Sequence, residues 1–352
     1  MKVFDYARPR TIAEAIAAAA EPGSVYLAAG TNLLDLMKGG IARPDRVVDV
    51  TRLPGLDRTE RLPDGGIRIG ALVRNADLAQ NPDFARTYPA VAEALLSGAS
   101  AQLRNAATVG GNLLQRTRCG YFHDVASACN KRAPGSGCNA RDGENRLHAV
   151  LGWSEACIAT HPSDFCVPLV ALDAVVEIEG RSGQREIAIE DLHRLPGHTP
   201  ELENSLEPGD LIVAIRLPAE AAAFSAHARY LKLRERTSYA FAVVSAAAAL
   251  DIEGGRIRQA RIALGGVAPK PWRARAAEDV LTGSAADESG FRRAAAAAIA
   301  DARPSGDNAF KIELARRIVL RALALAAAGT PERLPALPAS PFSSIPGAHH
   351  AA

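Results

Sequence analysis

All five cysteines of the 352-residue chain lie within one short segment, at Cys119, Cys129, Cys138, Cys157 and Cys166. Residues 116–146 around the first three are rich in Gly, Asn, Arg and Cys and show no sustained apolar period. A loop of this length inside a compact domain is usually functional or disordered, and disorder is unusual for a segment that holds three cysteines. The odd number of cysteines argues against a complete disulfide framework. We therefore expect an ordered loop whose cysteines are ligands or a reactive site.

The spacing of these cysteines leaves two interpretations open. No Cys-x-x-Cys pair occurs, which argues against a zinc ribbon. Four thiolates from an irregular, glycine-rich loop can hold a cubane iron–sulfur cluster. The alternative is a set of buried structural or reducible cysteines. His123, His148 and His161 lie in the same region, but a histidine bonded to backbone or carboxylate is the commoner case, so we do not take them as ligands.

Local charge favours the cluster. Between residues 116 and 146, the basic residues outnumber the acidic ones by three, which would offset the negative charge of a cluster held by four thiolates. The basic residues are Arg116, Arg118, Lys131, Arg132, Arg141 and Arg146, and the acidic ones are Asp124, Asp142 and Glu144.

Composition excludes several classes of protein. The length predicts two or three domains, and 48% hydrophobic with 23% charged residues is an ordinary globular mixture. A net charge of +2 and 5% aromatic residues argue against nucleic-acid binding. The longest near-apolar stretch, residues 239–250, is shorter than the roughly 20 residues that a membrane span needs, so we expect no membrane insertion. The chain starts without a secretory signal, so we expect a cytoplasmic protein, or a periplasmic one exported with a signal-bearing partner.

Two loops of small residues are candidates for binding an anion. Residues 28–32 (AAGTN) lie between a predicted strand at 25–27 and a predicted helix at 33–37, and residues 108–112 (TVGGN) form a second such loop. Consecutive small residues allow backbone N–H groups to approach an anion closely, and two such loops suit a pyrophosphate. The alternative is that each is only a tight turn. A GxGxxA match at 135–140 follows no strand, so it does not indicate a Rossmann fold.

Other elements follow from local patterns. Thr11 and Glu14 have capping-box spacing at the start of a helix that runs through Ala20. A hairpin is predicted at 243–252 and 256–264 around Glu253-Gly254-Gly255. Further strands are expected at 46–50, 67–69, 174–179 and 210–217, a turn-rich connection at 56–66, and helices at 90–96 and around 310–322. No motif of a hydrolase, an NTPase or a metalloprotease is present.

Three motifs in this order carry a resemblance to a known family. AAGTNLL at 28–34, TVGGNL at 108–113 and Pro162-Ser163-Asp164 resemble the FAD-binding medium subunit of molybdenum hydroxylases, the xanthine dehydrogenase and carbon monoxide dehydrogenase group. The resemblance extends to about residue 328. The cysteine segment is similar to the branch whose flavin subunit also carries a 4Fe–4S cluster. That branch includes periplasmic aldehyde oxidoreductase, which the chain resembles most, and, with a different loop, 4-hydroxybenzoyl-CoA reductase.

The resemblance implies an α+β fold in two domains. A two-lobed FAD-binding domain of the PCMH type would span 1–222, with lobes at about 1–53 and 54–222 and an iron–sulfur loop at 116–158. A C-terminal domain of a small antiparallel sheet with helices would span 223–330. A proline-rich tail at 331–352 would follow and contribute to partner interfaces.

The resemblance also implies residue roles. The pyrophosphate of FAD would be held by Leu27, Ala28, Ala29, Gly30, Thr31, Asn32, Leu33 and Leu34, with Thr108, Gly111 and Asn112 as a second clamp. Asp164 would bond the flavin side chain, and Lys232 would lie near the isoalloxazine. The cluster ligands would be Cys119, Cys129, Cys138 and Cys157, whereas Cys166 would be a small buried hydrophobe.

The implied function is electron transfer in a heterotrimer. A large partner would carry the molybdenum cofactor, a small partner would carry 2Fe–2S clusters, and this chain would pass their electrons through FAD to an external acceptor. No catalytic acid or base is expected here, because the cofactor carries the redox chemistry. Alternatives are a xanthine-dehydrogenase-like or aromatic acyl-CoA reductase complex, a non-enzymatic iron–sulfur protein, and a free-standing flavin oxidase. The oxidase would need a covalent His or Cys attachment near the first loop, and residues 23–40 contain neither.

Overall fold

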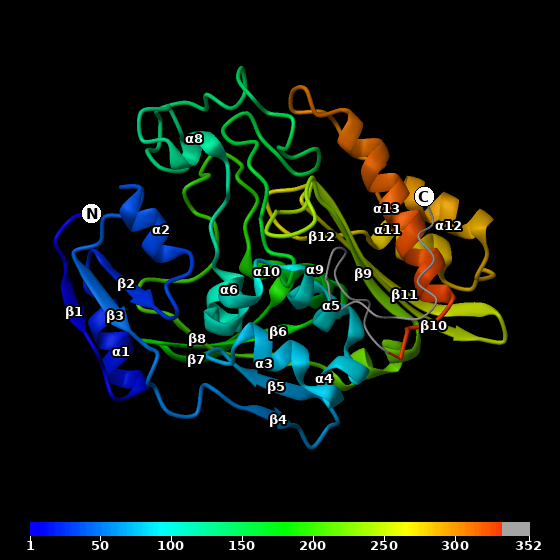
Figure 1. Ribbon diagram of the computed structural model, residues 1–352, viewed down its shortest axis with the longest axis horizontal. Coiled ribbons are helices and arrows are strands. Elements are labelled where there is room, and N and C mark those ends of the chain that lie inside the picture. The colour runs from blue at the N-terminus through cyan, green and yellow to red at the C-terminus, as the bar shows by residue number, and fades with distance from the viewer. Residues whose placement is uncertain (333–352) are drawn as a thin grey trace.

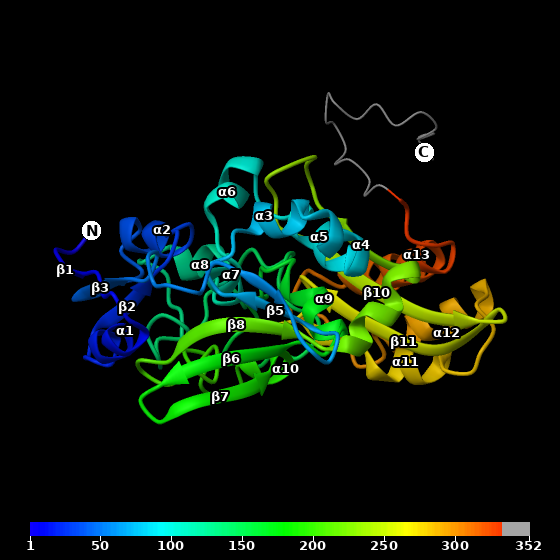
Figure 2. The ribbon, with the colours of Figure 1, turned by 90° about the horizontal axis from the view of Figure 1, so that it is seen from below.

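A computed structural model describes residues 1–332 of the chain. Its three β-sheets follow one another along the long axis of the molecule, from the N-terminal end to the C-terminal end (Figure 1, Figure 2). The predicted proline-rich tail lies outside the described residues, except for its first two. Among the residues that the structure describes, no helix is long and apolar enough to cross a membrane.

The N-terminal sheet is small and parallel, with strand order β1-β3-β2. Its strands are β1 (Asp5–Ala7), β2 (Ser24–Leu27) and β3 (Arg46–Asp49), and its helices are α1 (Ile12–Ala19) and α2 (Leu33–Lys38). The predicted capping box is present, because the Thr11 hydroxyl accepts from the Glu14 N–H and the Glu14 carboxylate accepts from the Thr11 N–H. Ala15 and Ile16 of α1 are buried, and the helix packs on β2 and β3.

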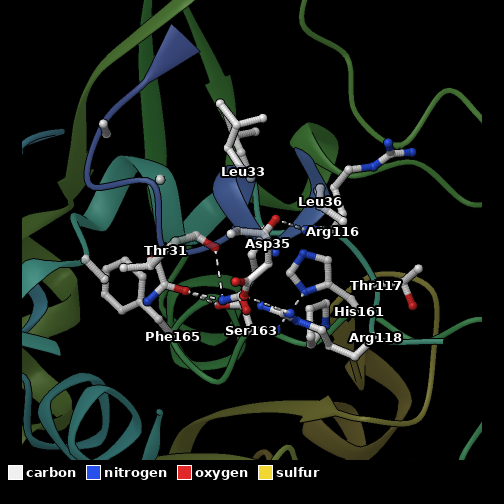
Figure 3. Close-up of a pocket in the computed structure, with 18 of the residues that line it drawn as sticks. Thr31, Leu33, Asp35, Leu36, Arg116, Thr117, Arg118, His161, Ser163 and Phe165 are labelled. Carbon is white, nitrogen blue, oxygen red and sulfur yellow. Dashed lines mark hydrogen bonds and ion pairs between the residues drawn. The ribbon is translucent and has the colours of Figure 1, made fainter. Parts of the chain in front are cut away.

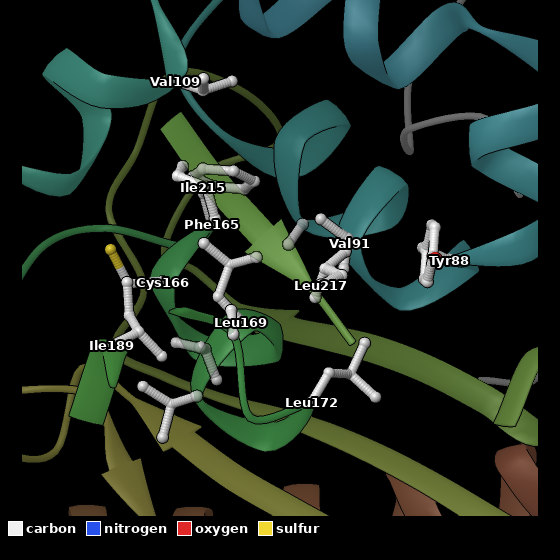
Figure 4. Packing of buried hydrophobic residues seen from close by; sticks show 14 of the residues in the cluster. Tyr88, Val91, Val109, Phe165, Cys166, Leu169, Leu172, Ile189, Ile215 and Leu217 are labelled. Atoms are coloured by element: carbon white, nitrogen blue, oxygen red, sulfur yellow. The ribbon is translucent and has the colours of Figure 1, made fainter. Parts of the chain in front are cut away.

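The central sheet is antiparallel and five-stranded, with order β4-β5-β8-β6-β7. Its strands are β4 (Thr59–Arg61), β5 (Ile67–Gly70), β6 (Val175–Gly180), β7 (Gly183–Ala188) and β8 (Leu211–Leu217). The associated helices are α3 (Asn75–Gln80), α4 (Pro82–Thr87), α5 (Pro89–Ser97), α6 (Ala101–Ala106), α7 (Val109–Leu113), α9 (Cys166–Ala171) and α10 (Ile189–Leu192). Ile215 and Leu217 of β8 meet Phe165, Leu169 and Val91 in the main core (Figure 4).

The C-terminal sheet is antiparallel, with order β12-β11-β10-β9. Its elements are β9 (Ala228–Leu233), β10 (Val244–Glu253), β11 (Arg256–Gly265), β12 (Trp272–Arg273), α11 (Arg275–Leu281), α12 (Glu288–Ala297) and α13 (Phe310–Ala327), and a 3-10 helix, η1 (Ala219–His227), leads into it. The predicted hairpin is β10–β11, and Gly254 and Gly255 turn it with positive φ.

Strand β10 joins two hydrophobic cores. Ala247 and Ala249 belong to the main core, whereas Ala246, Ala248 and Leu250 belong to a second core under α11, α12 and α13. This alternation is what a strand requires, since successive side chains point to opposite faces. The sheet of the C-terminal domain is therefore buried on both faces along β10, which fixes it against the central helices. The domain limits given above stay predictions.

Several elements differ from the sequence-based expectations. The connection at 56–66 contains β4, whose three residues are all exposed, and β7 was also not predicted. Neither strand has the buried apolar alternation that marks a strand in sequence. The segment between α7 and α9 is irregular as predicted, apart from the short helix α8 (Gly120–His123) (Figure 1). There Phe122 is fully buried against Leu36 of α2, which orders this part of the cysteine segment.

Candidate functional site

A cavity of about 2040 Å³ lies between the N-terminal lobe, the central helices and the cysteine segment. It is far larger than the 300–1,000 Å³ of a site for an ordinary small ligand. Figure 3 shows side chains from three parts of the chain gathered around it: Thr31 from the first loop, Arg116 and Arg118 from the cysteine segment, and His161 and Ser163 from the turn before α9. The three motifs at 28–34, 108–112 and 162–164, far apart in sequence, line this one cavity.

The first loop presents unpaired backbone donors to the cavity. Gly30 has φ of 75°, a conformation that favours glycine, and its carbonyl accepts from the Leu34 N–H. Within residues 1–332, the N–H groups of residues 29–32 have no hydrogen-bond acceptor. The side-chain Nδ2 of Asn32 is also buried without a partner, while its Oδ1 accepts from the Arg116 N–H. A row of donors without acceptors is the arrangement that binds an anion.

The second loop is the start of a helix rather than an open nest. Thr108 caps α7, and its hydroxyl accepts from the Gly111 N–H at 3.3 Å. Gly111 is exposed to the cavity, whereas Gly110 is buried against Ala71. The Asn112 Oδ1 accepts from Ser163 Oγ at 2.8 Å, which ties the second motif to the third.

Asp164 is held by two donors from β9. Its Oδ1 accepts from the Tyr230 hydroxyl at 2.6 Å and its Oδ2 from Lys232 Nζ at 2.7 Å. Burial, with the neighbouring carboxylate, raises the pKa of Tyr230 well above its usual value, so the phenol stays protonated and donates. Lys232 also donates to the Ser97 carbonyl and lies behind Asp164, outside the cavity lining. Asp164 therefore lies between Lys232 and the cavity, and the roles predicted for both residues toward FAD stay predictions.

Other residues of the predicted set also lie off the cavity, and some unpredicted ones lie on it. Leu27 ends β2 and does not line the cavity. Arg104 lines it and was not predicted as a site residue, nor was Arg118, which lies over the Phe241 ring at 5.2 Å with its Nε buried and unpaired. Neither arginine stands in a recognisable motif, so only their position in the fold identifies them.

The four predicted ligand cysteines line a second, small cavity next to the first. Cys129 and Cys138 face each other across an isolated antiparallel bridge. Cys119 lines both cavities and therefore forms part of the wall between them. Backbone N–H groups of Tyr121 and Phe122 bond to the Cys119 sulfur, and His148 Nε2 lies 3.2 Å from it. No disulfide joins any of the five cysteines.

Burial governs the protonation of these thiols. It raises the pKa of Cys119 to about 11, against the lowering effect of the Tyr121 and Phe122 amides. It also raises the pKa of Cys157, which the nearby Lys131 ammonium and the Ala159 N–H oppose. Without a metal the Cys119 and Cys157 thiols are therefore neutral at pH 7, and a bound metal would displace their protons. Four cysteines around one small cavity, two of them buried and two with backbone N–H donors to the sulfur, fit the donor set of an iron–sulfur cluster.

The excess positive charge expected for residues 116–146 is balanced by acidic residues from elsewhere in the chain. Most of the basic residues in 116–146 meet acids from outside that window, so the surplus of three does not stay free to offset a cluster. The pairs are Arg116 and Lys131 with Glu203, Arg118 with Asp35, Arg141 with Glu155, and Arg146 with Glu235. Arg132 instead donates to backbone carbonyls of the segment, which orders it.

Cys166 lies in the main hydrophobic core, fully buried, and away from the cavity of the other four (Figure 4). Burial raises its pKa to about 12, as for a small neutral core residue. Its sulfur lies near the rings of His161 and His193, whose centroids are 4.3 Å apart. Burial also lowers the pKa of His193 to about 4, so this ring is neutral and hydrogen-bonds the Leu113 carbonyl through Nε2 at 2.7 Å.

Comparison with known protein families gives two matches that together cover most of the chain. Residues 2–220 match the family described as the FAD binding domain in molybdopterin dehydrogenase. Residues 229–326 match the CO dehydrogenase flavoprotein C-terminal domain.

Individual proteins show the same similarity. The chain is 50% identical over 330 residues to the aldehyde oxidoreductase FAD-binding subunit PaoB of Escherichia coli, covering 93% of this chain and 99% of that protein. It is 29% identical to the carbon monoxide dehydrogenase medium chain of Hydrogenophaga pseudoflava, covering 91% and 96%. A solved structure of that organism's carbon monoxide dehydrogenase superposes with a TM-score of 0.72 at 28% identity, covering 92% of this chain and 97% of that one. Quinoline 2-oxidoreductase of Pseudomonas putida superposes with 0.71 at 26%, covering 93% and 99%.

Proposed function

Because the chain belongs to the family of FAD-binding medium subunits of molybdenum hydroxylases, we propose that it is the FAD- and 4Fe–4S-containing electron-transfer subunit of a heterotrimeric aldehyde oxidoreductase. In this proposal a large partner carries the molybdenum cofactor, where the aldehyde is oxidised, and a small partner carries 2Fe–2S clusters. The aldehyde class and the partners are supported by the 50% identity to a protein named as an aldehyde oxidoreductase subunit.

The observation that carries the FAD site is the row of unpaired donors in the first loop. The N–H groups of residues 29–32 belong to residues that line a cavity large enough for a dinucleotide, and they have no acceptor in the part of the chain described. A diphosphate supplies the acceptors that these groups lack. Gly111 in the second loop has no side chain, so the backbone of this loop can also approach the diphosphate. A Cβ at this position would lie 3.1 Å from the Thr108 hydroxyl.

The remaining residues position and shield the site. Bound FAD supplies a redox centre that takes up electrons and passes them to an acceptor. Tyr230 and Lys232 hold the Asp164 carboxylate in one orientation at the cavity wall, ready to accept a hydrogen bond from a polyol hydroxyl. Ser163 and Asn112 fix the neighbouring wall. Because each of these groups is already bonded within the protein, little reorganisation accompanies binding.

The cluster proposal is supported by the donor set of the second cavity. Cys119, Cys129, Cys138 and Cys157 share one small buried space, and backbone N–H groups bond to two of the sulfurs. Soft thiolates select iron–sulfur clusters or zinc among common metals, so iron analysis is needed to separate the two. Since Cys119 also lines the flavin cavity, a group held by these cysteines would adjoin the flavin.

The test is anaerobic purification of the full chain, alone and co-expressed with its partners. We expect one noncovalent FAD and about four irons per chain, as a cubane on four cysteines requires. The isolated, flavin-loaded chain is expected to transfer electrons from an artificial donor to a dye. It is not expected to oxidise aldehydes. Aldehyde oxidation by the chain alone would contradict the electron-transfer role. If the anaerobically purified protein contains zinc and no iron, the four cysteines form a structural zinc site and the cluster proposal is wrong.

A further inference from the structure

The buried ammonium of Lys311 has no role in the site described so far. Lys311 lies on the first turn of α13, is fully buried, and its Nζ donates to the carbonyls of Leu147, His148 and Gly266 at 2.8, 2.8 and 2.6 Å. Three acceptors use all three protons of an ammonium, whereas a neutral amine has two to donate. Burial, and after it the Arg146 guanidinium, lowers the pKa of Lys311 to about 7. Hydrogen bonds to three carbonyls favour the charged form.

Asn308, just before α13, bonds the same stretch of backbone. Its Nδ2 donates to the carbonyls of His148 and Ala149, both at 3.1 Å, and it is also fully buried. Together, Lys311 and Asn308 place four hydrogen bonds on residues 147–149. Such a concentration of buried donors on three carbonyls fixes the backbone of that stretch. The C-terminal domain thereby controls the position of a residue in the cysteine segment.

The fixed residue is His148, whose ring reaches a predicted cluster ligand. Its Nε2 lies 3.2 Å from the Cys119 sulfur, and its Nδ1 is buried without a partner in the described structure. A metal-bound thiolate sulfur only accepts hydrogen bonds, so beside one the Nε2 must carry the proton and donate it. Hydrogen bonds to the sulfurs are one of the factors that set the reduction potential of an iron–sulfur cluster.

We propose that Lys311 and Asn308 are positioning residues that hold His148 against Cys119, so that the Nε2–H donates to this sulfur and raises the reduction potential of the cluster. The inference rests on the proposed cluster. It gives the C-terminal domain a role in electron transfer, because two of its residues, about 160 positions away from His148 in sequence, would influence the reduction potential of the cluster. A donor to the sulfur stabilises the reduced cluster, which has the greater negative charge, so its removal lowers the potential.

The test is an EPR-monitored redox titration of the anaerobically purified full chain. His148→Leu is expected to raise the ratio of oxidised to reduced cluster about tenfold at a fixed potential, a shift of about 59 mV for one electron. His148→Gln, which keeps an N–H donor, should recover part of the shift. The matched control is His123→Leu, in the same segment, whose Nε2 bonds the Thr117 carbonyl instead of a sulfur. That variant should titrate as the wild type does.

A double-mutant cycle separates positioning from a direct charge effect. Lys311→Met should shift the potential in the same direction as His148→Leu, and should add nothing in the His148→Leu background. If Lys311→Met does not fold, Asn308→Ser takes its place in the cycle. An unchanged potential in His148→Leu would overturn the inference, and so would full additivity of the two shifts. A wild-type chain without any cluster signal would instead remove the proposed cluster itself.

Discussion

Replacing Gly111 with valine should separate flavin binding from folding. Gly111 faces the cavity from the first turn of α7, and its φ lies outside the range that only glycine favours. An added Cβ would lie 3.1 Å from the Thr108 hydroxyl, so this cap must shift by a few tenths of an ångström. Weakening an N-cap costs about 1 kcal/mol, whereas replacing glycine in a helix contributes about 0.5 kcal/mol in the opposite direction. The stability of the flavin-free chain should therefore change by less than about 1 kcal/mol.

The effect on flavin affinity should be much larger. In the proposed site, the valine methyl groups would occupy the space through which the backbone approaches the diphosphate, so at least one hydrogen bond to a charged group would be lost. Such a bond contributes about 1.5–3 kcal/mol, which corresponds to a roughly tenfold to hundredfold higher Kd. Gly111→Ala should give a smaller loss, because its single methyl group fills less of the cradle.

The assay is titration of the flavin-free chain with FAD by fluorescence quenching, alongside urea unfolding of the same samples. A Kd for the valine variant within about threefold of the wild type, with stability unchanged, would refute the role of this loop. A variant that fails to fold would refute the stability estimate, and the alanine variant would then test the loop alone.

Three further results are expected. Lys232→Met leaves its buried carboxylate partner without a cation and should lower the free energy of unfolding by about 3–5 kcal/mol; a loss under 1 kcal/mol in urea unfolding would contradict a buried ion pair. Cys129→Ser should lose the iron while FAD is at least partly retained, whereas Cys166→Ser should keep its iron; the reverse pattern would show that the ligand set is wrong. Burial lowers the pKa of His193 from 6.5 to about 4, so as the pH falls the unfolded chain takes up a proton at this residue before the folded chain does. The contribution of His193 to the free energy of unfolding should therefore fall by about 3 kcal/mol between pH 7 and pH 4. His193→Asn should reduce the slope of stability against pH, although buried His148 and His161 still contribute to it, whereas the exposed His198→Asn should leave the slope unchanged; equal slopes in both variants would disprove the role of His193.

Features set by neighbouring residues were predictable from the sequence. The capping box of Thr11 and Glu14 and the Gly254-Gly255 hairpin each depend on residues close along the chain, and both are present in the structure. The loop at 28–32 was also recognised, since a run of small residues between a strand and a helix is a local pattern. The resemblance added the family, which the comparison confirms by matching residues 2–220 to an FAD binding domain.

Features that depend on distant residues were not predictable in this way. Strand β4 has no apolar residue facing a core and exists because it pairs with β5, so its own sequence carries no signal. The charge count over 116–146 missed Glu203, which lies about 70 to 90 residues further along and forms ion pairs with two of the basic residues. The contact of Lys311 with the His148 carbonyl spans 163 positions, and only the packing of α13 brings the two together.

The most direct test of the account is metal and flavin analysis of the full chain purified without oxygen. The proposed function predicts one FAD, released by denaturation, and about four irons with matching acid-labile sulfide in every chain. Replacement of Cys119, which lines both cavities, by serine should remove the iron. Full FAD without iron, in protein never exposed to air, would contradict the cluster and leave four structural thiols in its place.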